Sequence, residues 1–382
     1  MKKLLAILIA LSLNFSLYAQ ENYKTAAKEK SVKTYRGGAA YPVKTYSPIF
    51  KAKKPKNIIL MIGDGMGTAQ IFAGLTANHG QLFLQNFKAV GFSRTQSADN
   101  YITDSAAGGT ALSSGYKTYN HAIGVDTDSI PHPTILEKAE DKGLSTGLVS
   151  TSAITHATPA SFIAHQPSRN SYEAIAADFL KTDIDVFIGG GYKHFTQRKD
   201  GRNLVEELKN KGYRVLQNMD EIEHVKSGKL AGLTAAEHNE RTTERGDMLR
   251  KATHEALRLL SQNNKGFFLM VEGSQIDWGG HQNNTIYIAR EMMDFDRSIG
   301  QALDFAANNG ETLIIVTADH ETGGMSIIDG DLKTGMVKGQ FTAGGHTGVM
   351  VPVFAFGPGA ENFTGIMENT DIAKKMMMML NL

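Results

Sequence analysis

The chain has 382 residues and carries 40 Lys and Arg against 39 Asp and Glu, a formal net charge of +1 at pH 7. This balance does not predict a nucleic-acid-binding surface, which ordinarily needs a basic excess. The sequence contains no Cys, so disulfides, thiolate metal ligands and a lipoprotein anchor are excluded. A chain of this length can bury enough apolar surface to fold without cross-links.

The N-terminus, residues 1–19, is typical of a signal peptide. Lys2 and Lys3 precede an apolar stretch, and Ala19 provides a small residue for cleavage. The apolar stretch is short and interrupted by Asn14, which disfavours a transmembrane helix. We therefore expect an exported protein, periplasmic or secreted, without a membrane anchor.

Residues 20–55 are polar, basic and dotted with Pro, which predicts an extended N-terminal arm ahead of a single catalytic domain over 56–382. From residue 56, short apolar runs alternate with amphipathic stretches, as buried strands alternate with helices. The apolar runs cover residues 57–63, 145–151, 185–191, 266–273, 312–318 and 349–357. This alternation predicts an α/β fold, a three-layer sandwich with a large, mainly parallel sheet flanked by helices.

Helical patterns lie between these runs, over residues 132–143 and 287–310. The second pattern ends in Asn-Asn-Gly, a common stop signal for a helix. Residues 369–380 predict a last helix whose Met run packs in the core. Residues 192–250 are more charged and less periodic, so we expect accessory helices and loops outside the sheet there.

Acidic and imidazole side chains recur where the predicted strands end. Ligands of open parallel sheets bind beyond the carboxyl ends of the strands. Alone, each such residue is more often structural, but oxygen and nitrogen ligands without sulfur suit zinc, and oxygen alone suits magnesium. Asp277 and His281 are four residues apart, so one helical turn could direct both at one ion. The set comprises Asp64, Glu272, Asp277, His281, Asp319, His320 and His346.

Two further stretches point to phosphate. The stretch TDSAAGGTALSSG, residues 103–115, predicts a turn into a helix with Ser105 at its N-terminus, where backbone N–H groups and the helix dipole favour an anion. A plain capping Ser explains that stretch equally well. Arg169 can hold two phosphate oxygens through its planar fork, although alone it would be interpreted as a surface residue.

Six motifs together resemble the alkaline phosphatase family: MIGDGMG, TDSAAGGTA, HATPASFIAH followed by Arg169, VEGSQIDWGGH, TADHETGG and GGHTG. Their order and spacing match that family across residues 57–358. The resemblance implies hydrolysis of small-molecule phosphate monoesters by a homodimer. It also implies that Ser105 is the nucleophile that becomes a phosphoserine, that Arg169 binds phosphate, and that Asp104 orients Arg169.

The resemblance further implies two zinc ions and one magnesium ion per subunit. The implied ligands are Asp277, His281 and His346 for one zinc; Asp64, Asp319 and His320 for the other; and Asp64, Thr158 and Glu272 for magnesium. The hydroxyl of Ser105 is also implied to bind zinc.

Some family members carry Asp and Lys where this chain has His156 and Trp278. The chain resembles the other bacterial type at these two positions, which lie beside the third metal and influence phosphate release. The crown-like insertion of the family corresponds to residues 325–343 and is expected to be small.

Two other functions remain open: a phosphodiesterase of the same superfamily and a catalytically silent zinc-binding protein. The Ser-Ala-Ala stretch and Arg169 favour monoesters over diesters, and the complete ligand set argues against a silent site. A sulfatase of this fold needs a distinctive formylglycine motif, and the sequence has none. Export disfavours a mutase acting on intracellular sugar phosphates.

Overall fold

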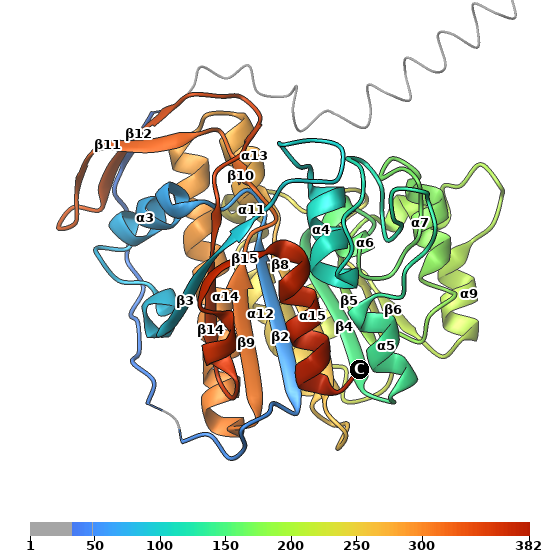
Figure 1. Ribbon diagram of the computed structural model, residues 1–382. Helices are drawn as coiled ribbons and strands as arrows, with labels where there is room; N and C mark the ends of the chain where they lie inside the picture. Colours follow the sequence, from blue (N-terminus) through green and yellow to red (C-terminus); the bar gives the residue numbers. More distant parts are fainter. Residues whose placement is uncertain (1–32, 48) are drawn as a thin grey trace, which may run out of the picture.

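The computed structural model describes residues 33–47 and 49–382. The predicted signal peptide, residues 1–19, and the first part of the predicted arm lie outside the described residues. At the centre of the molecule is a ten-stranded sheet with helices on both of its faces (Figure 1). The predicted α/β fold, a three-layer sandwich around a large and mainly parallel sheet, is confirmed.

All six apolar runs that predict strands form strands of this sheet. Its order is β15 (Gly365–Glu368), β3 (Ala89–Arg94), β14 (Val351–Phe356), β9 (Thr312–Thr317), β2 (Asn57–Gly63), β8 (Phe267–Gly273), β4 (Ser145–Ala153), β5 (Val186–Gly190), β7 (Leu230–Leu233) and β6 (Arg214–Leu216). The sequence analysis missed β3, β15, β6 and β7. These strands are short or, as in β3, alternate buried with exposed residues, so they lack a continuous apolar run.

The prediction that residues 192–250 lie outside the sheet is wrong. This segment supplies β7 and β6, which extend the sheet beyond β5 through parallel pairing. Its charged residues lie mostly in the loops that join these strands to the short helices around them. The helices are α8 (Tyr192–Thr196), α9 (Leu204–Asn210), α10 (Met219–Ile222) and α11 (Thr242–Arg245), followed by the longer α12 (Met248–Leu260).

The direction of β14 decides which end of the sheet its first residues reach. From β9 to β6 every neighbouring pair of strands is parallel. β14 instead runs antiparallel to both β9 and β3, with Phe354 opposite Val316. The segment that precedes β14 therefore lies at the edge where the parallel strands end.

Each face of the sheet is covered by its own helices. One core contains side chains of α12, α14 (Thr285–Asn309) and α3 (Thr68–Ala77). The other contains side chains of α4 (Ser105–Ser114), α5 (Ile135–Asp141), α7 (Tyr172–Asp178) and α15 (Asn369–Leu380). In the part of the chain that the structure describes, no helix has the length and apolar character needed to cross a membrane.

The predicted helix signals agree with these elements. α14 ends at Asn309, and Gly310 follows with a left-handed φ of 75°, the conformation that makes Gly a common residue after a helix. In α15, Met376, Met377 and Met379 are buried, so the predicted core packing is confirmed for three of the four Met residues. Met378 is exposed.

The arm and the predicted insertion form a second, smaller sheet. β11 (Met325–Asp331) and β12 (Met336–Phe341) make a hairpin, and β1 (Thr34–Arg36) pairs with β12. Further along the arm, the Tyr41 hydroxyl donates to Asp296 at 2.6 Å. Asp296 belongs to α14, so the described part of the arm is held against the body of its own chain.

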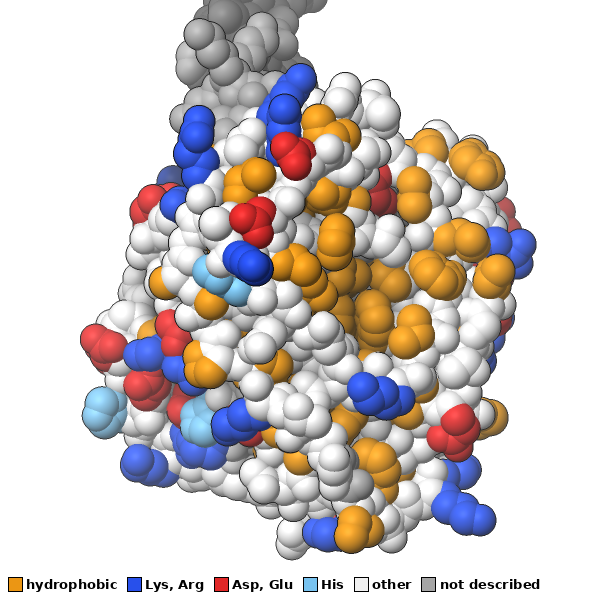
Figure 2. Space-filling model, turned by 90° about the vertical axis from the view of Figure 1, so that its left-hand side faces the viewer, with side chains coloured by type: hydrophobic (Ala, Val, Ile, Leu, Met, Phe, Trp, Pro, Cys, Tyr) orange, Lys and Arg blue, Asp and Glu red, His pale blue; other side chains and the backbone are white. Residues whose placement is uncertain are grey.

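An apolar surface lies at the β15 edge of the large sheet. Val90 and Phe92 of β3 and Ile366 of β15 are exposed, and the register places Phe92 beside Ile366. Figure 2, which looks onto the side of α3 and β3, shows hydrophobic side chains gathered on this face. We call these three residues the edge patch. Contiguous apolar surface of this kind commonly marks a site of association.

A buried ion cluster joins α11 to α14. The Arg245 guanidinium lies 2.5 Å from a Glu291 oxygen and 2.6 Å from an Asp294 oxygen, and all three side chains are at most 4% exposed. Burying charges is costly unless they are paired. Removing Arg245 would therefore leave the buried Glu291 without an ion-pair partner among the described residues, whereas Asp294 would keep its pair with Arg297 at 2.8 Å.

Replacing Arg245 with Met should lower the free energy of unfolding by about 3–5 kcal/mol, the usual cost of breaking a buried ion pair from one side. Urea denaturation followed by circular dichroism measures this change. The matched control is Arg202→Met, which breaks the exposed pair with Glu207 and should cost less than about 1 kcal/mol. Equal destabilisation by the two variants would contradict this account of Arg245.

Candidate active site

The predicted site residues converge at the carboxyl edge of the sheet. Asp64 directly follows β2, Glu272 lies in β8, and Asp319 and His320 follow β9. The remaining predicted residues come from short elements at the same edge. They are Asp277, Trp278 and His281 in α13 (Gln275–His281), His156 and Thr158 at α6 (Ala157–Ala160), and His346 in β13 (His346–Thr347), which pairs with β10 (Glu321–Thr322).

Asp277, His281 and His346 form the first cluster. One ligand atom from each lies within 4.8 Å of the others. The Nδ1 atoms of His281 and His346 each lie 2.9 Å from a backbone carbonyl oxygen, and a carbonyl can only accept, so both Nδ1 atoms donate. In the neutral rings both Nε2 atoms then carry lone pairs, although they face each other at 3.2 Å. A cation between them would turn this repulsion into coordination.

His320 is the centre of the second cluster. Its Nε2 lies 3.2 Å from an Asp319 oxygen and 3.5 Å from an Asp64 oxygen, and ligand atoms of Asp64, Asp277 and His320 lie within 4.8 Å of one another. The Thr322 hydroxyl donates to Asp277 at 2.5 Å and lies 3.2 Å from His320 Nδ1. Since that hydroxyl gives its proton to Asp277, it accepts from Nδ1, and His320 Nε2 presents a lone pair to the two carboxylates.

The third cluster joins Asp64, Glu272 and His156, whose ligand atoms also lie within 4.8 Å of one another. The predicted Thr158 is present here, because its hydroxyl donates to the second Asp64 oxygen at 3.4 Å. The Ser150 hydroxyl donates to Glu272 at 2.5 Å and fixes that carboxylate. His156 therefore lies among the potential ligands rather than behind them.

Trp278, the other predicted neighbour of this cluster, meets the His156 ring edge-on, with centroids 6.4 Å apart. The His238 ring packs against both of these side chains, at centroid separations of 5.5 Å and 5.0 Å.

The sequence analysis missed Thr322, Ser150 and His238. Thr322 lies inside the TADHETGG motif, where its position two residues after His320 was the available signal. His238 lies in the segment interpreted as accessory, and no local pattern marks it.

The carboxylates of the site carry more negative charge than the surrounding residues neutralise. Asp64 Oδ1, Glu272 Oε1 and Asp319 Oδ2 are buried without a hydrogen-bond partner. Burial, with the charges of Asp277 and Glu272, raises the pKa of Asp319 to about 8. Burial and the neighbouring Asp319 likewise raise the pKa of Asp64 well above its usual range. These unpaired, buried oxygens fit bound cations.

Ser105 lies at the mouth of these clusters as the first residue of α4. Asp104 is the N-cap, because its carboxylate accepts from the Ala107 N–H at 3.0 Å, so the alternative that Ser105 merely caps the helix is wrong. The Ser105 hydroxyl lies 3.2 Å from His320 Nε2. A Cβ at Gly108 would come within 3.1 Å of Asp319, so the Gly there lets α4 approach the site.

Arg169 extends over the same helix end. Its Nη1 donates to Asp104 Oδ2 at 2.9 Å, and its Nη2 lies 3.3 Å from His156 Nε2. Burial opposes ionisation of Asp104, but Arg169 and the Ala107 N–H outweigh it and lower the pKa of Asp104 to about 2. A guanidinium held in this way beside a helix N-terminus is suited to an anion with several oxygens.

Comparisons with known proteins identify alkaline phosphatases as relatives of this chain. A family model described as "Alkaline phosphatase" matches residues 55–339 and 333–382. Alkaline phosphatase 3 of Bacillus subtilis (strain 168) is 33% identical over 469 aligned positions, covering 98% of this chain and 96% of its own. The alkaline phosphatase of Escherichia coli (strain K12) is 32% identical, covering 86% and 87%.

Solved structures of alkaline phosphatases also resemble this chain. The alkaline phosphatase from the Antarctic bacterium TAB5 superposes with a TM-score of 0.81 at 43% identity, covering 86% of this chain and 99% of that one. A mutant of the TAB5 enzyme with Mg bound in the M3 site gives a TM-score of 0.82 at 42% identity, covering 87% and 99%.

The raised carboxyl pKa values predict how the metal-free protein responds to pH. Because the pKa of Asp319 is higher in the folded protein than in the unfolded chain, the folded state binds more protons between about pH 4 and pH 8. Its stability therefore falls as the pH rises through this window, by about 1.4 kcal/mol per pH unit for each proton involved. His194 and His238, whose pKa values burial lowers to about 4, act in the opposite direction below about pH 6.5. The contribution of Asp319 is therefore isolated by comparison with Asp319→Asn: relative to that variant, the melting temperature of the chelated wild type should fall from pH 5 to pH 8.

Scanning fluorimetry with a chelator, and with zinc and magnesium, measures this dependence. Added metal should remove most of this relative fall, because bound cations compensate the carboxylate charges. A melting-temperature difference between the chelated wild type and Asp319→Asn that does not change from pH 5 to pH 8, or that changes in favour of the wild type, would contradict the account.

Proposed function

The chain belongs to the alkaline phosphatase family of phosphate monoester hydrolases, and we propose that it acts through a phosphoserine intermediate on Ser105. The observation that carries this proposal is the position of the Ser105 hydroxyl. It is buried at the N-terminus of α4, 3.2 Å from His320 Nε2, with the Arg169–Asp104 pair at the same helix end. Residues 56–382 would act as one catalytic unit.

The residues of the site can carry both halves of the reaction. In the first half, Ser105 Oγ loses its proton and attacks phosphorus, the P–O bond of the ester breaks, and the leaving oxygen takes up a proton to give the alcohol, so that a phosphoserine forms. In the second half, water attacks phosphorus, the bond to Ser105 Oγ breaks, and inorganic phosphate is released. Arg169 and the backbone N–H groups of α4 neutralise the non-bridging oxygens in both halves, while Asp104 keeps the guanidinium in place.

We propose two zinc ions and one magnesium ion as cofactors. The first cluster offers two imidazoles and a carboxylate, a donor set typical of zinc. Asp64, Asp319 and His320 offer a similar set, and the oxygens of Asp64, Thr158 and Glu272 suit magnesium. The TAB5 mutant in which one His is replaced by Asp has Mg bound in its M3 site, which supports magnesium as a metal of this family. When bound, such ions would supply Lewis-acid activation of the serine hydroxyl, the leaving oxygen and the attacking water.

The proposal extends to location and assembly. The signal peptide predicted for residues 1–19 supports export to the periplasm or the medium. The edge patch of Val90, Phe92 and Ile366 supports a homodimer, because closed two-fold pairing would cover this apolar surface in both copies.

Replacing Ser105 with Ala should reduce hydrolysis of a chromogenic phosphate monoester at least about a thousandfold, because the nucleophile is lost. Metal content should stay the same, since the carboxylates and imidazoles remain. The matched control is Ser114→Ala at the other end of α4, which should keep full activity. Acid-quenched wild-type enzyme incubated with labelled substrate should carry phosphate on Ser105.

The same assay separates the alternative functions. Faster turnover of a phosphate diester than of the monoester would favour the phosphodiesterase. Zinc binding without turnover of any ester would favour the silent metal-binding protein, and undiminished activity of Ser105→Ala would contradict the role of Ser105.

The double variant Phe92→Glu, Ile366→Glu should convert a dimer into a monomer, because four carboxylates would meet across the paired patches. Size-exclusion chromatography with light scattering measures the mass. Ile130→Glu, at an exposed hydrophobic residue outside the edge patch, is the control and should leave the mass unchanged. A wild-type protein of monomer mass would contradict the proposed homodimer.

A further inference from the structure

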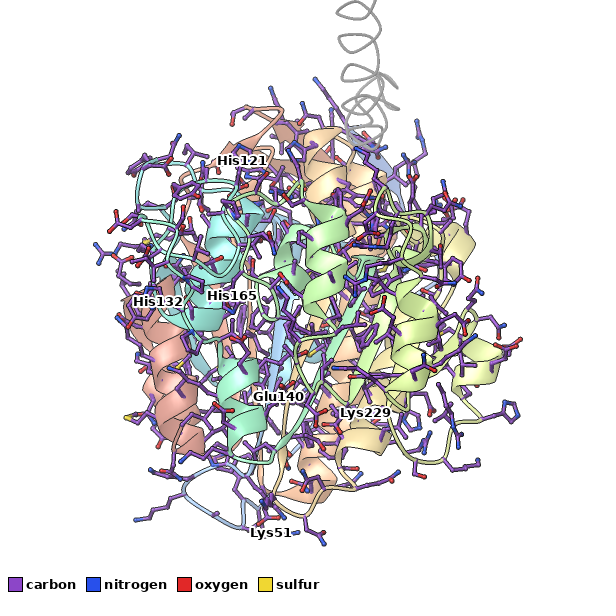
Figure 3. The ribbon with its side chains drawn as sticks, turned by 90° about the vertical axis from the view of Figure 1, so that its right-hand side faces the viewer. Lys51, His121, His132, Glu140, His165 and Lys229 are labelled. Carbon is purple, nitrogen blue, oxygen red and sulfur yellow. The ribbon has the colours of Figure 1, made fainter. Side chains whose placement is uncertain are left out.

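His121 combines two features that are unusual beside an active site. Its backbone has a left-handed φ of 76°, a conformation that side-chain-bearing residues rarely adopt and that costs free energy. Its side chain is 66% exposed, whereas the side chains of Asp104 and Arg169 are 11% and 14% exposed. Figure 3 shows His121 at the upper end of the molecule, above His132 and His165, and the parallel strands end on this side.

His121 contacts both members of the phosphate-binding pair. Its N–H donates to Asp104 Oδ1 at 3.1 Å, and its carbonyl oxygen accepts from the Arg169 N–H at 2.7 Å. Its Nδ1 lies 3.5 Å from Asp104 Oδ2, the same oxygen that accepts from Arg169 Nη1 at 2.9 Å. One residue with a left-handed backbone thus makes all three contacts.

The imidazole affects phosphate binding in the same direction whichever charge it carries. A protonated ring adds positive charge beside Arg169, at the mouth of the site. A neutral ring with its proton on Nδ1 directs the N–H dipole at Asp104 Oδ2 from 3.5 Å, beyond a good hydrogen bond, and so weakens the hold of Asp104 on Arg169 only slightly. In both states the ring strengthens the attraction between Arg169 and phosphate.

We propose that His121 is a positioning residue that increases the affinity of the site for phosphate, in substrate and product, by acting through Asp104 on Arg169. This inference rests on the proposed role of Arg169 in binding phosphate. The inference also gives the strained backbone at His121 a role, because this backbone holds the imidazole against Asp104 while the ring stays at the entrance of the site.

The variant His121→Gly isolates the imidazole, because Gly adopts a left-handed φ without strain and keeps both backbone contacts. In the metal-loaded enzyme, the dissociation constant of inorganic phosphate, measured by calorimetry, should rise about threefold, as for one partly exposed ionic contact. KM should rise by a similar factor without a fall in kcat. Asn tolerates the same left-handed backbone and provides a polar side chain. The phosphate dissociation constant of His121→Asn should therefore lie between those of the wild type and His121→Gly.

His79→Gly is the matched control. His79 is also an exposed His with a left-handed φ, 57°, but its Nε2 lies 3.1 Å from the Gly38 carbonyl oxygen, at the end of α3. This variant should bind phosphate like the wild type. Three results would overturn the inference: His121→Gly binds phosphate as tightly as the wild type, His79→Gly binds it as weakly as His121→Gly, or His121→Gly loses only kcat. A wild-type enzyme that neither binds phosphate nor hydrolyses monoesters would instead overturn the proposed function.

Discussion

The burial of four carboxylates in one small volume is the constraint on which the rest of the site depends. Burial raises the pKa values of Asp64, Glu272 and Asp319, and neighbouring carboxylates raise those of Asp64 and Asp319 further. Asp277 differs, because His281, His346 and His320 outweigh its burial and lower its pKa. Such a cluster is stable in its charged form only when cations occupy it. The histidines therefore present lone pairs inward, and backbone carbonyls and Thr322 hold their other nitrogens.

The fold brings the residues of this charge cluster together at one edge of the large sheet. The parallel strands β2, β8 and β9 bring acidic residues to a single edge of the sheet. These residues are buried there, and helices cover both faces of the sheet. The antiparallel β14 adds His346 to the same edge, because its start lies where β9 ends. On the rim, α4 places Ser105 against His320, and the Arg169–Asp104 pair lies at the same helix end. Metal binding and phosphate binding thus share one edge of one sheet.

Much of this arrangement could be predicted from the sequence, for identifiable reasons. Buried strands have continuous apolar runs, so β2, β4, β5, β8, β9 and β14 were found, and the acidic residues at their ends predicted the site. The direction of β14 was not predictable, because an apolar run has no direction, although the place of His346 depends on it. Edge strands such as β6 lack an apolar run altogether. His238 and His121 act through contacts made only in the folded chain, and nothing in their local sequence marks them. Thr322 lies in a recognised motif, but its contacts with Asp277 and His320 form only in the folded chain.

Metal content is the most direct test of the central claim that buried negative charge at the sheet edge is compensated by cations. Purified wild-type protein would be equilibrated with zinc and magnesium, dialysed, and measured by inductively coupled plasma mass spectrometry. The account predicts that zinc and magnesium fill the three clusters, two zinc ions and one magnesium ion per chain. It also predicts that Asp64→Asn, which touches two of the clusters, loses more than one ion. A folded, active protein that retains no stoichiometric metal would contradict it.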